Sequence, residues 1–235
     1  MSEQVTIDRR FNGPPESGHG GYVCGVVAGL VGGQAEVTLR RPPPLDRPLD
    51  VRRLQSGGVA LLDGETVIAE GAPASLDIDV PEPVALPDAE AASRSYLGFR
   101  RHPFPTCFAC GPQRAEGDGL RILPGRAEGR NMVAAPWTAN SSLTDEEGTL
   151  RPEFMWAALD CPGAWALMTD LSEAPPVVLG RLAAKLLAPV RGGERCVAIG
   201  WPLGEEGRKL YSGTALFSEE RELRAFARAT WVILA

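Results

Sequence analysis

A histidine and two glycines, His19-Gly20-Gly21, stand just before a run of small and apolar residues, 22–30, where a helix is expected to begin. The first N–H groups of a helix have no partner within it, and the helix dipole makes that end positive. Glycine adds no Cβ that would block an approaching carbonyl oxygen. Gly20 and Gly21 could therefore donate hydrogen bonds to an oxygen that gains negative charge during a reaction. The alternative is a flexible helix start capped by Ser17, without a chemical role.

Cysteines are the other reactive side chains. Cys107 and Cys110 are spaced as in a metal-binding turn, and His102 precedes them. A structural zinc site needs four such ligands, and no second Cys/His pair follows in the sequence. The remaining cysteines stand apart from one another: Cys24, Cys161 and Cys196. We therefore expect no metal, no cofactor and a tight turn of buried thiols. An odd number of cysteines without a regular framework is typical of a reducing compartment, so we expect a cytoplasmic protein.

The composition is that of a folded chain. It has 235 residues, of which 44% are hydrophobic, and this is enough to bury a substantial core. No stretch approaches the roughly 18 uninterrupted apolar residues of a membrane span, and the polar N-terminus does not resemble a signal peptide. The formal net charge of −6 gives no general attraction for phosphate backbones. We expect neither nucleic-acid binding nor insertion into a membrane.

The first half of the sequence predicts one helix among several strands. Residues 5–11 alternate apolar and polar side chains, as a half-buried strand does. Residues 20–30 are almost all small or apolar, which suits a helix surrounded by protein. A strand-like run at 37–41 ends in a proline-marked turn. Residues 59–62 and 65–70 flank an Asp-Gly pair, which favours a tight hairpin.

A connector is expected over residues 76–100, because prolines punctuate an acidic stretch that ends in the helix-prone residues 88–94. The second half then repeats the order of the first, with a central helix over residues 152–167. The expected strand segments around this helix are 120–123, 131–135, 177–187, 196–203, 209–218 and 222–234, of which the last four form an antiparallel meander. Such duplication indicates two similar units, residues 1–75 and 101–235, joined by the 76–100 linker.

A sheet wrapped around one central helix is the hotdog fold, and particular residues resemble that family. His19-Gly20-Gly21 resembles the His-Gly-Gly signature of hotdog acyl-CoA thioesterases of the phenylacetate-pathway type. In the second half, Arg151-Pro152-Glu153 takes the place of that signature, and Asp160 falls where the family has its catalytic carboxylate. The segment from Cys107 to Pro112 is also similar to the opening of single-hotdog relatives. The resemblance implies an α+β fold, a double hotdog in which each unit is an antiparallel sheet around one central helix.

The resemblance further implies sites between the two units. One composite site would combine Gly20 and Gly21 with Asp160 as catalytic groups for the hydrolysis of an acyl-CoA thioester. That reaction needs donors for the oxyanion and a carboxylate that attacks or activates water. The opposite site would be inactive, because Pro152 has no N–H to donate. The residues expected to bind substrate are Asn12, His19, Tyr22, Glu153 and Trp156.

Other interpretations stay open. Asp160 also fits the cap of a helix that begins with Cys161-Pro162, and Glu153 fits a surface acid in a first helical turn. The chain could be a noncatalytic double-hotdog protein that binds an acyl-CoA or a similar thioester. A hotdog dehydratase, with His19 as a base against Asp160, is a third possibility. In each case we expect a homo-oligomer, and a homodimer in particular.

Overall fold

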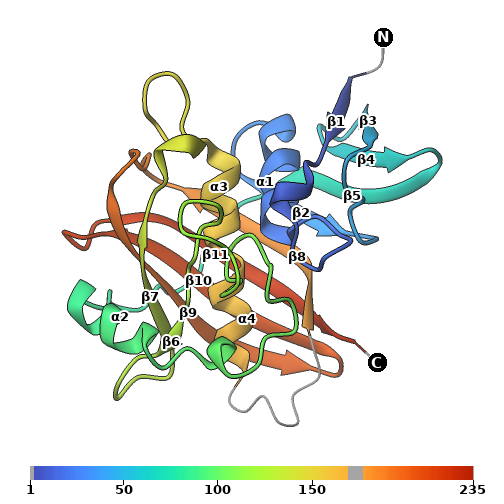
Figure 1. The fold of residues 1–235 in the computed structure, drawn as a ribbon. Coiled ribbons are helices and arrows are strands. Elements are labelled where there is room, and N and C mark those ends of the chain that lie inside the picture. The colour runs from blue at the N-terminus through green and yellow to red at the C-terminus, as the bar shows by residue number, and fades with distance from the viewer. Residues whose placement is uncertain (1–2, 169–176, 235) are drawn as a thin grey trace.

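The computed structural model describes residues 3–168 and 177–234 and has an α+β architecture built on one large sheet (Figure 1). Within these ranges the strand order is β1-β3-β4-β5-β2-β8-β11-β10-β9-β7-β6. The first half supplies β1 (Gln4–Thr6), β2 (Ala35–Leu39), β3 (Pro48–Arg53), β4 (Val59–Asp63) and β5 (Thr66–Pro73). The second half supplies β6 (Gly125–Arg126), β7 (Val133–Thr138), β8 (Val177–Leu186), β9 (Arg195–Glu206), β10 (Lys209–Ser218) and β11 (Leu223–Ile233).

The two halves share this sheet because β2 of the first half pairs with β8 of the second. The pairing is antiparallel and places Ala35 opposite Ala184 and Val37 opposite Leu182. Val37 and Leu182 are both fully buried, so the junction belongs to the core. Hydrogen bonds and hydrophobic burial therefore hold the halves together.

Three helices lie over one face of the sheet: α1 (Gly20–Val31), α3 (Pro152–Ala158) and α4 (Cys161–Leu167). The helix of the first half, α1, packs against α3, whereas α4 lies on β9 and β10 (Figure 1). Gly200 of β9 permits this close approach, because a Cβ there would overlap the carbonyl group of Pro162. Within the described ranges, no helix has the length and apolar character to cross a membrane.

The single helix expected over residues 152–167 is wrong, because the chain breaks it into α3 and α4. Pro162 has no N–H and cannot donate to the Ala158 carbonyl, as a continuous helix would require. The carbonyl of Leu159, in the break, instead accepts a 2.6 Å hydrogen bond from the Thr214 hydroxyl. The break leaves Asp160 between the two helices.

The sheet is covered on its other face as well. Cys196 and Ala198 of β9 belong to the core that also contains residues of α1, α3 and α4, whereas Val197 and Ile199 join a second core with α2 (Leu86–Ser93). This alternation is what strand geometry requires when both faces are buried. The segment expected as a connector thus contains a helix that covers the sheet, and it is more than a spacer.

Three other expectations need correction. The strand expected over 5–11 stops at Thr6, and Arg9–Phe11 forms a 3₁₀ helix whose first turn is capped by the Asp8 side chain. Residues 120–123 lie outside the sheet, because the N–H groups of Leu120 and Ile122 bond to the loop carbonyls of Phe108 and Ala109.

The meander is limited to β9, β10 and β11, since β8 pairs with β11 on one side and with β2 on the other. Two further 3₁₀ helices span Leu97–Phe99 and Ser141–Leu143.

Candidate functional site

His19 caps the N-terminus of α1. Its backbone is extended, and its Nδ1 atom accepts a 3.2 Å hydrogen bond from the N–H of Tyr22. The capping role expected as an alternative for Ser17 is therefore taken by His19. Among the described residues the N–H of Gly20 has no hydrogen-bond partner, as expected for an amide in the first turn of a helix.

Asp160 faces this helix end from the break between α3 and α4. Its Oδ2 atom accepts a 2.6 Å hydrogen bond from the N–H of Gly21, across the boundary between the two halves. Although Asp160 stands at the capping position of α4, its side chain makes no capping hydrogen bond there. Its Oδ1 atom is buried and has no hydrogen-bond partner among the described residues. The carboxylate is thus aimed at α1 and has one free acceptor.

Two glycines of α1 make this contact possible. A Cβ on Gly21 would lie 2.5 Å from Asp160 Cβ and 2.7 Å from the Trp156 carbonyl oxygen. A Cβ on Gly25, one turn later, would lie 2.6 Å from Glu153 Cα. Because only glycine fits at such distances, α1 and α3 touch along their backbones.

The His19 ring contacts both Asp160 and a cysteine through one nitrogen. Nε2 lies 3.3 Å from Asp160 Oδ2 and 3.3 Å from Cys161 Sγ. Since Nδ1 accepts the Tyr22 N–H, the ring proton of neutral His19 lies on Nε2 and points at these acceptors. This arrangement is incompatible with a proton relay in which Nδ1 of His19 donates a hydrogen bond while Nε2 accepts one.

Burial governs the protonation of the site. It raises the pKa of the Asp160 carboxyl to about 6, although His19 and the Gly21 N–H favour the charged form. Burial acts to lower the pKa of His19, but the negative charges of Asp160 and Cys107 outweigh it and raise that pKa above its ordinary value. The two side chains are therefore buried together, and each binds a proton more readily than it would in water.

The other expected substrate-binding residues lie in different surroundings. Trp156 and Glu153 lie at the contact between α1 and α3, and both approach Gly25. Tyr22 belongs to an aromatic cluster, where its ring stacks on Phe11 with centroids 4.3 Å apart. Burial raises the pKa of Tyr22 to about 12, so its hydroxyl stays protonated at neutral pH. Trp156 and Glu153 shape the helix contact, whereas Tyr22 packs beside it.

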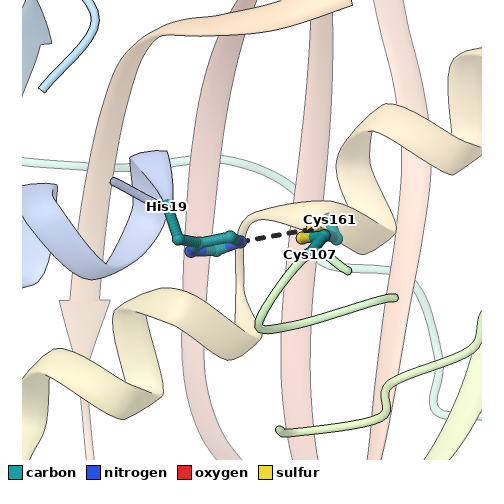
Figure 2. Close-up of side chains that lie close together, drawn as sticks. All are labelled: His19, Cys107 and Cys161. Carbon is teal, nitrogen blue, oxygen red and sulfur yellow. Dashed lines mark hydrogen bonds between the residues drawn. The ribbon is translucent and has the colours of Figure 1, made fainter. Parts of the chain in front are cut away.

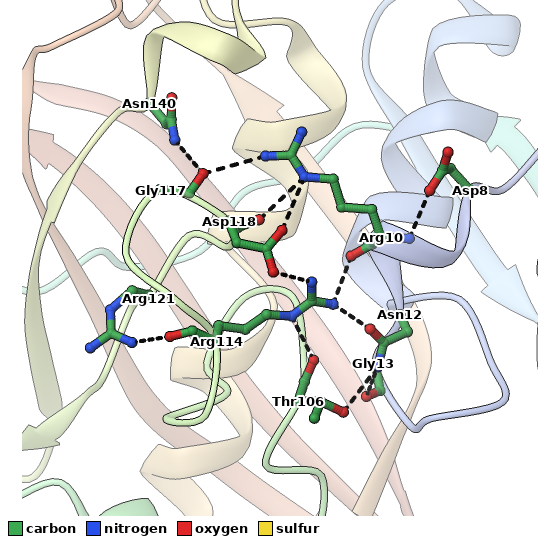
Figure 3. A network of polar contacts seen from close by, with 10 residues as sticks. All are labelled: Asp8, Arg10, Asn12, Gly13, Thr106, Arg114, Gly117, Asp118, Arg121 and Asn140. Atoms are coloured by element: carbon green, nitrogen blue, oxygen red, sulfur yellow. Dashed lines mark hydrogen bonds and ion pairs between the residues drawn. The ribbon is translucent and has the colours of Figure 1, made fainter.

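Asn12 belongs to a separate polar network centred on Arg114 (Figure 3). The Arg114 guanidinium donates to the Asn12 side chain, to the Arg10 carbonyl at 2.7 Å and to the Thr106 carbonyl at 2.8 Å. It also pairs with Asp118 at 2.8 Å. This network ties residues near the start of the chain to the loop that follows the connector, and it places the Asn12 side chain with Arg114 instead of Asp160.

The same loop brings sulfur atoms to the site. Cys107 Sγ lies 3.8 Å from Cys161 Sγ, beside the His19 ring (Figure 2). These three residues could hold a metal ion, because their ligand atoms all lie within 4.8 Å of one another.

The side chains of His19 and Asp160 are almost completely enclosed. Two surface hollows, one beside α2 and one between β2 and β5, do not reach these side chains.

No family model and no curated protein matches the chain, but solved structures do. A candidate thioesterase from Novosphingobium aromaticivorans aligns with a TM-score of 0.63 at 14% identity, over 99% of this chain and 95% of that chain. The tesB protein of Mycobacterium avium subspecies paratuberculosis gives 0.64 at 10% identity, with 99% and 92% covered. A candidate thioesterase II from Thermobifida fusca gives 0.61 at 14% identity, with 99% and 92% covered. These full-length likenesses confirm the expected fold: the chain is an α+β double hotdog.

Sequence reasoning missed two features of this site. The Gly21 and Gly25 pair, four residues apart on one helix face, was a readable signal for close helix packing. The position of Cys161 beside Cys107 had no local signal, because the two residues are 54 positions apart in the sequence.

Proposed function

We propose that this chain hydrolyses a thioester, with an acyl-CoA as the substrate class, at one composite site between its two halves. The observation that supports this proposal is the contact between Asp160 Oδ2 and the N–H of Gly21, which joins a carboxylate of the second half to the helix start of the first. The likeness to solved thioesterases supports the same class of reaction. We place this activity in the cytoplasm and expect a homodimer.

In this mechanism the Gly21 N–H orients Asp160 through Oδ2, and Oδ1 accepts a proton from water. The resulting hydroxide attacks the thioester carbonyl carbon, and the N–H of Gly20 stabilises the negative charge that forms on the carbonyl oxygen. The carbon–sulfur bond then breaks, and the proton held by Asp160 passes to the leaving thiolate. The products are a carboxylic acid and a free thiol. His19 stays beside Asp160 and stabilises its charge.

The enclosure of the site favours a second candidate function, a double-hotdog protein that binds an acyl-CoA or a similar thioester without turnover. Asp160 and His19 are buried, and neither surface hollow reaches them. A chain that had lost catalysis could keep the fold and fill its former site with packed side chains.

The test is hydrolysis of a panel of short, long and aromatic acyl-CoA substrates by wild type and by Asp160→Asn. The substitution keeps the shape and removes the carboxylate, so kcat is expected to fall by about two to four powers of ten with little change in KM. Asp63→Asn is the matched control, because Asp63 lies at the β4–β5 turn, where it pairs with Arg47, and its activity is expected to equal wild type.

Two outcomes would contradict the proposal. If Asp160→Asn hydrolysed its substrates at the wild-type rate, the carboxylate would have only a structural role. If wild type bound one member of the panel tightly and hydrolysed none, the binding function would replace hydrolysis.

A further inference from the structure

Three segments that are distant in sequence bring metal-binding atoms together beside α1. His19 caps α1, Cys161 is the first residue of α4, and Cys107 lies in the loop after the connector. All three side chains are buried, and Figure 2 shows them converging on one point. Sulfur and imidazole nitrogen are the ligand atoms that zinc prefers in structural sites.

The spacing of these atoms matches a tetrahedral ion. Zinc–sulfur bonds of roughly 2.3 Å and zinc–nitrogen bonds of roughly 2.0 Å put two sulfurs about 3.8 Å apart, and a sulfur and a nitrogen about 3.5 Å apart. The structure has 3.8 Å between Cys107 Sγ and Cys161 Sγ, and 3.3 Å between His19 Nε2 and Cys161 Sγ. These two distances are within a few tenths of an ångström of tetrahedral spacing, and the third pair, the His19 ring nitrogen and Cys107 Sγ, lies within 4.8 Å.

The turn that follows Cys107 could supply a fourth ligand after a movement of Cys110, because its Sγ lies outside the group of atoms within 4.8 Å of one another and contacts His102 Nε2 at 3.3 Å. Cys110 is buried in the same turn, which closes through a 2.9 Å hydrogen bond from the Gly111 N–H to the Cys107 carbonyl. A Cβ at Gly111 would lie 2.5 Å from that carbonyl oxygen, so this tight turn requires glycine. Two cysteines separated by two residues and followed by such a turn form half of many structural zinc sites.

Metal binding would change the protonation of the cysteines. A thiolate is the form of cysteine that binds a metal, so the thiols would lose their protons as the ion binds.

We propose that Cys107, Cys110, Cys161 and His19 bind one zinc ion, which fastens the loop of the second half to the starts of α1 and α4. This site shares His19 with the surroundings of Asp160, since Nε2 lies 3.3 Å from Asp160 Oδ2, and it departs from the expectation drawn from the sequence. The expectation of no metal considered only ligands close to Cys107 and Cys110 in the sequence. The fold adds His19 and Cys161, which come from distant segments.

Metal binding through Nε2 has a consequence for His19. Its ring proton would move to Nδ1, and the 3.2 Å capping hydrogen bond from Tyr22 would be lost. The loss of one long capping bond is small beside the affinity of a site with three thiolates for zinc. The nitrogen-15 NMR signals of His19 should therefore report a change of tautomer when zinc is added to the metal-free chain.

The principal experiment is elemental analysis of the full chain, purified without chelator, together with cobalt substitution. We expect about one zinc per chain, and we expect the cobalt form to show thiolate-to-metal charge-transfer absorption. Cys107→Ser and Cys161→Ser should each lose most of the metal, and His19→Ala should bind zinc more weakly against a competing chelator. Cys196→Ala is the matched control, because this buried cysteine lies on β9 outside the cluster.

Several outcomes would contradict the proposed zinc site. They are a metal-free chain that binds neither zinc nor cobalt when either is added, a Cys107–Cys161 disulfide found by mass spectrometry, and zinc content unchanged by Cys107→Ser. If a serine variant does not fold, thiol titration of wild type with and without added zinc decides the question, because zinc should protect three cysteines from the reagent. These readouts do not depend on thioester hydrolysis, so the metal site and the proposed activity can fail independently.

Discussion

Asp160 combines a satisfied oxygen with an unsatisfied one inside the protein. Oδ2 accepts the Gly21 N–H, whereas buried Oδ1 has no partner among the described residues. A buried acceptor without a partner costs roughly 1–3 kcal/mol, and such atoms in native proteins call for an explanation. A substrate or a water molecule at Oδ1 would remove this cost, and this is the physical reason to look for chemistry at Asp160.

Arg114 gives the prediction at the residue scale. Its side chain is only 10% exposed and makes hydrogen bonds in several directions, to Asn12, Arg10, Thr106 and Asp118. Lysine keeps the charge but loses the planar fork that reaches these acceptors together. Arg114→Lys is expected to lower the free energy of unfolding by about 1–3 kcal/mol, measured by urea denaturation.

Arg9→Lys is the matched control for this prediction. Arg9 pairs with Asp46 at the surface, where its side chain is 65% exposed, so the change should be within about 0.5 kcal/mol. Equal stability of the Arg114 and Arg9 variants would show that the network around Arg114 does not fasten the loop.

At the scale of elements, the contact between α1 and α3 sets the position of Asp160. At Gly21 and Gly25 the α1 backbone lies so close to α3 and Asp160 that a Cβ would collide with the Trp156 carbonyl oxygen and with Glu153 Cα. The break after α3 then turns Asp160 toward the start of α1 instead of letting the helix continue. Close packing and a broken helix together place a second-half carboxylate on a first-half amide.

Gly25 tests this contact. Gly25→Ala would place a methyl group 2.6 Å from Glu153 Cα, where backbone must move, so we expect destabilisation of about 1–3 kcal/mol. Gly29→Ala is the matched control on the same helix, because a Cβ there meets nothing within 4 Å. That variant should gain about 0.5–1 kcal/mol from helix propensity. Thermal and urea denaturation of both variants would check the opposite signs, and a stabilised Gly25→Ala would show that the helices can separate without loss.

Local patterns predicted the elements better than their connections. The apolar run of α1, the Asp-Gly hairpin and the long final strands follow from periodicity and turn residues. Pro162 marked a helix start, yet a continuous apolar pattern hid the break before it. The neighbours of β8 depend on the assembly of both halves, and no pattern within residues 177–187 specifies them.

Some features of the candidate site could likewise be predicted from the sequence, and others could not. A glycine pair at a helix start and a carboxylate at the family's position could be read from the sequence, and the structure brings Gly21 and Asp160 together. The place of Asn12 beside Arg114, and of Cys161 beside Cys107, depends on contacts between segments far apart in the chain. The spacing of residues along the sequence does not predict such long-range contacts.

At the scale of the whole molecule, the two halves are joined by shared contacts. They share the β2–β8 ladder and the α1–α3 contact. The Phe108 N–H also donates a 2.7 Å hydrogen bond to the Asn12 carbonyl across the halves. Neither half could bury its helix and complete its sheet edge alone, so we expect one cooperative unfolding transition.

A chain cut between the halves tests this expectation. Ser75 is exposed and follows the last strand of the first half, so a protease site inserted after it should be cleaved without disturbing either helix. The fragments 1–75 and 76–235 should then elute together on size exclusion, separate only in denaturant, and unfold in a single calorimetric transition. The uncleaved insertion variant is the control and should have the Tm of wild type. Fragments that separate in native buffer, or two resolved transitions, would show instead that each hotdog unit is stable alone and that the shared sheet adds little to the stability of either.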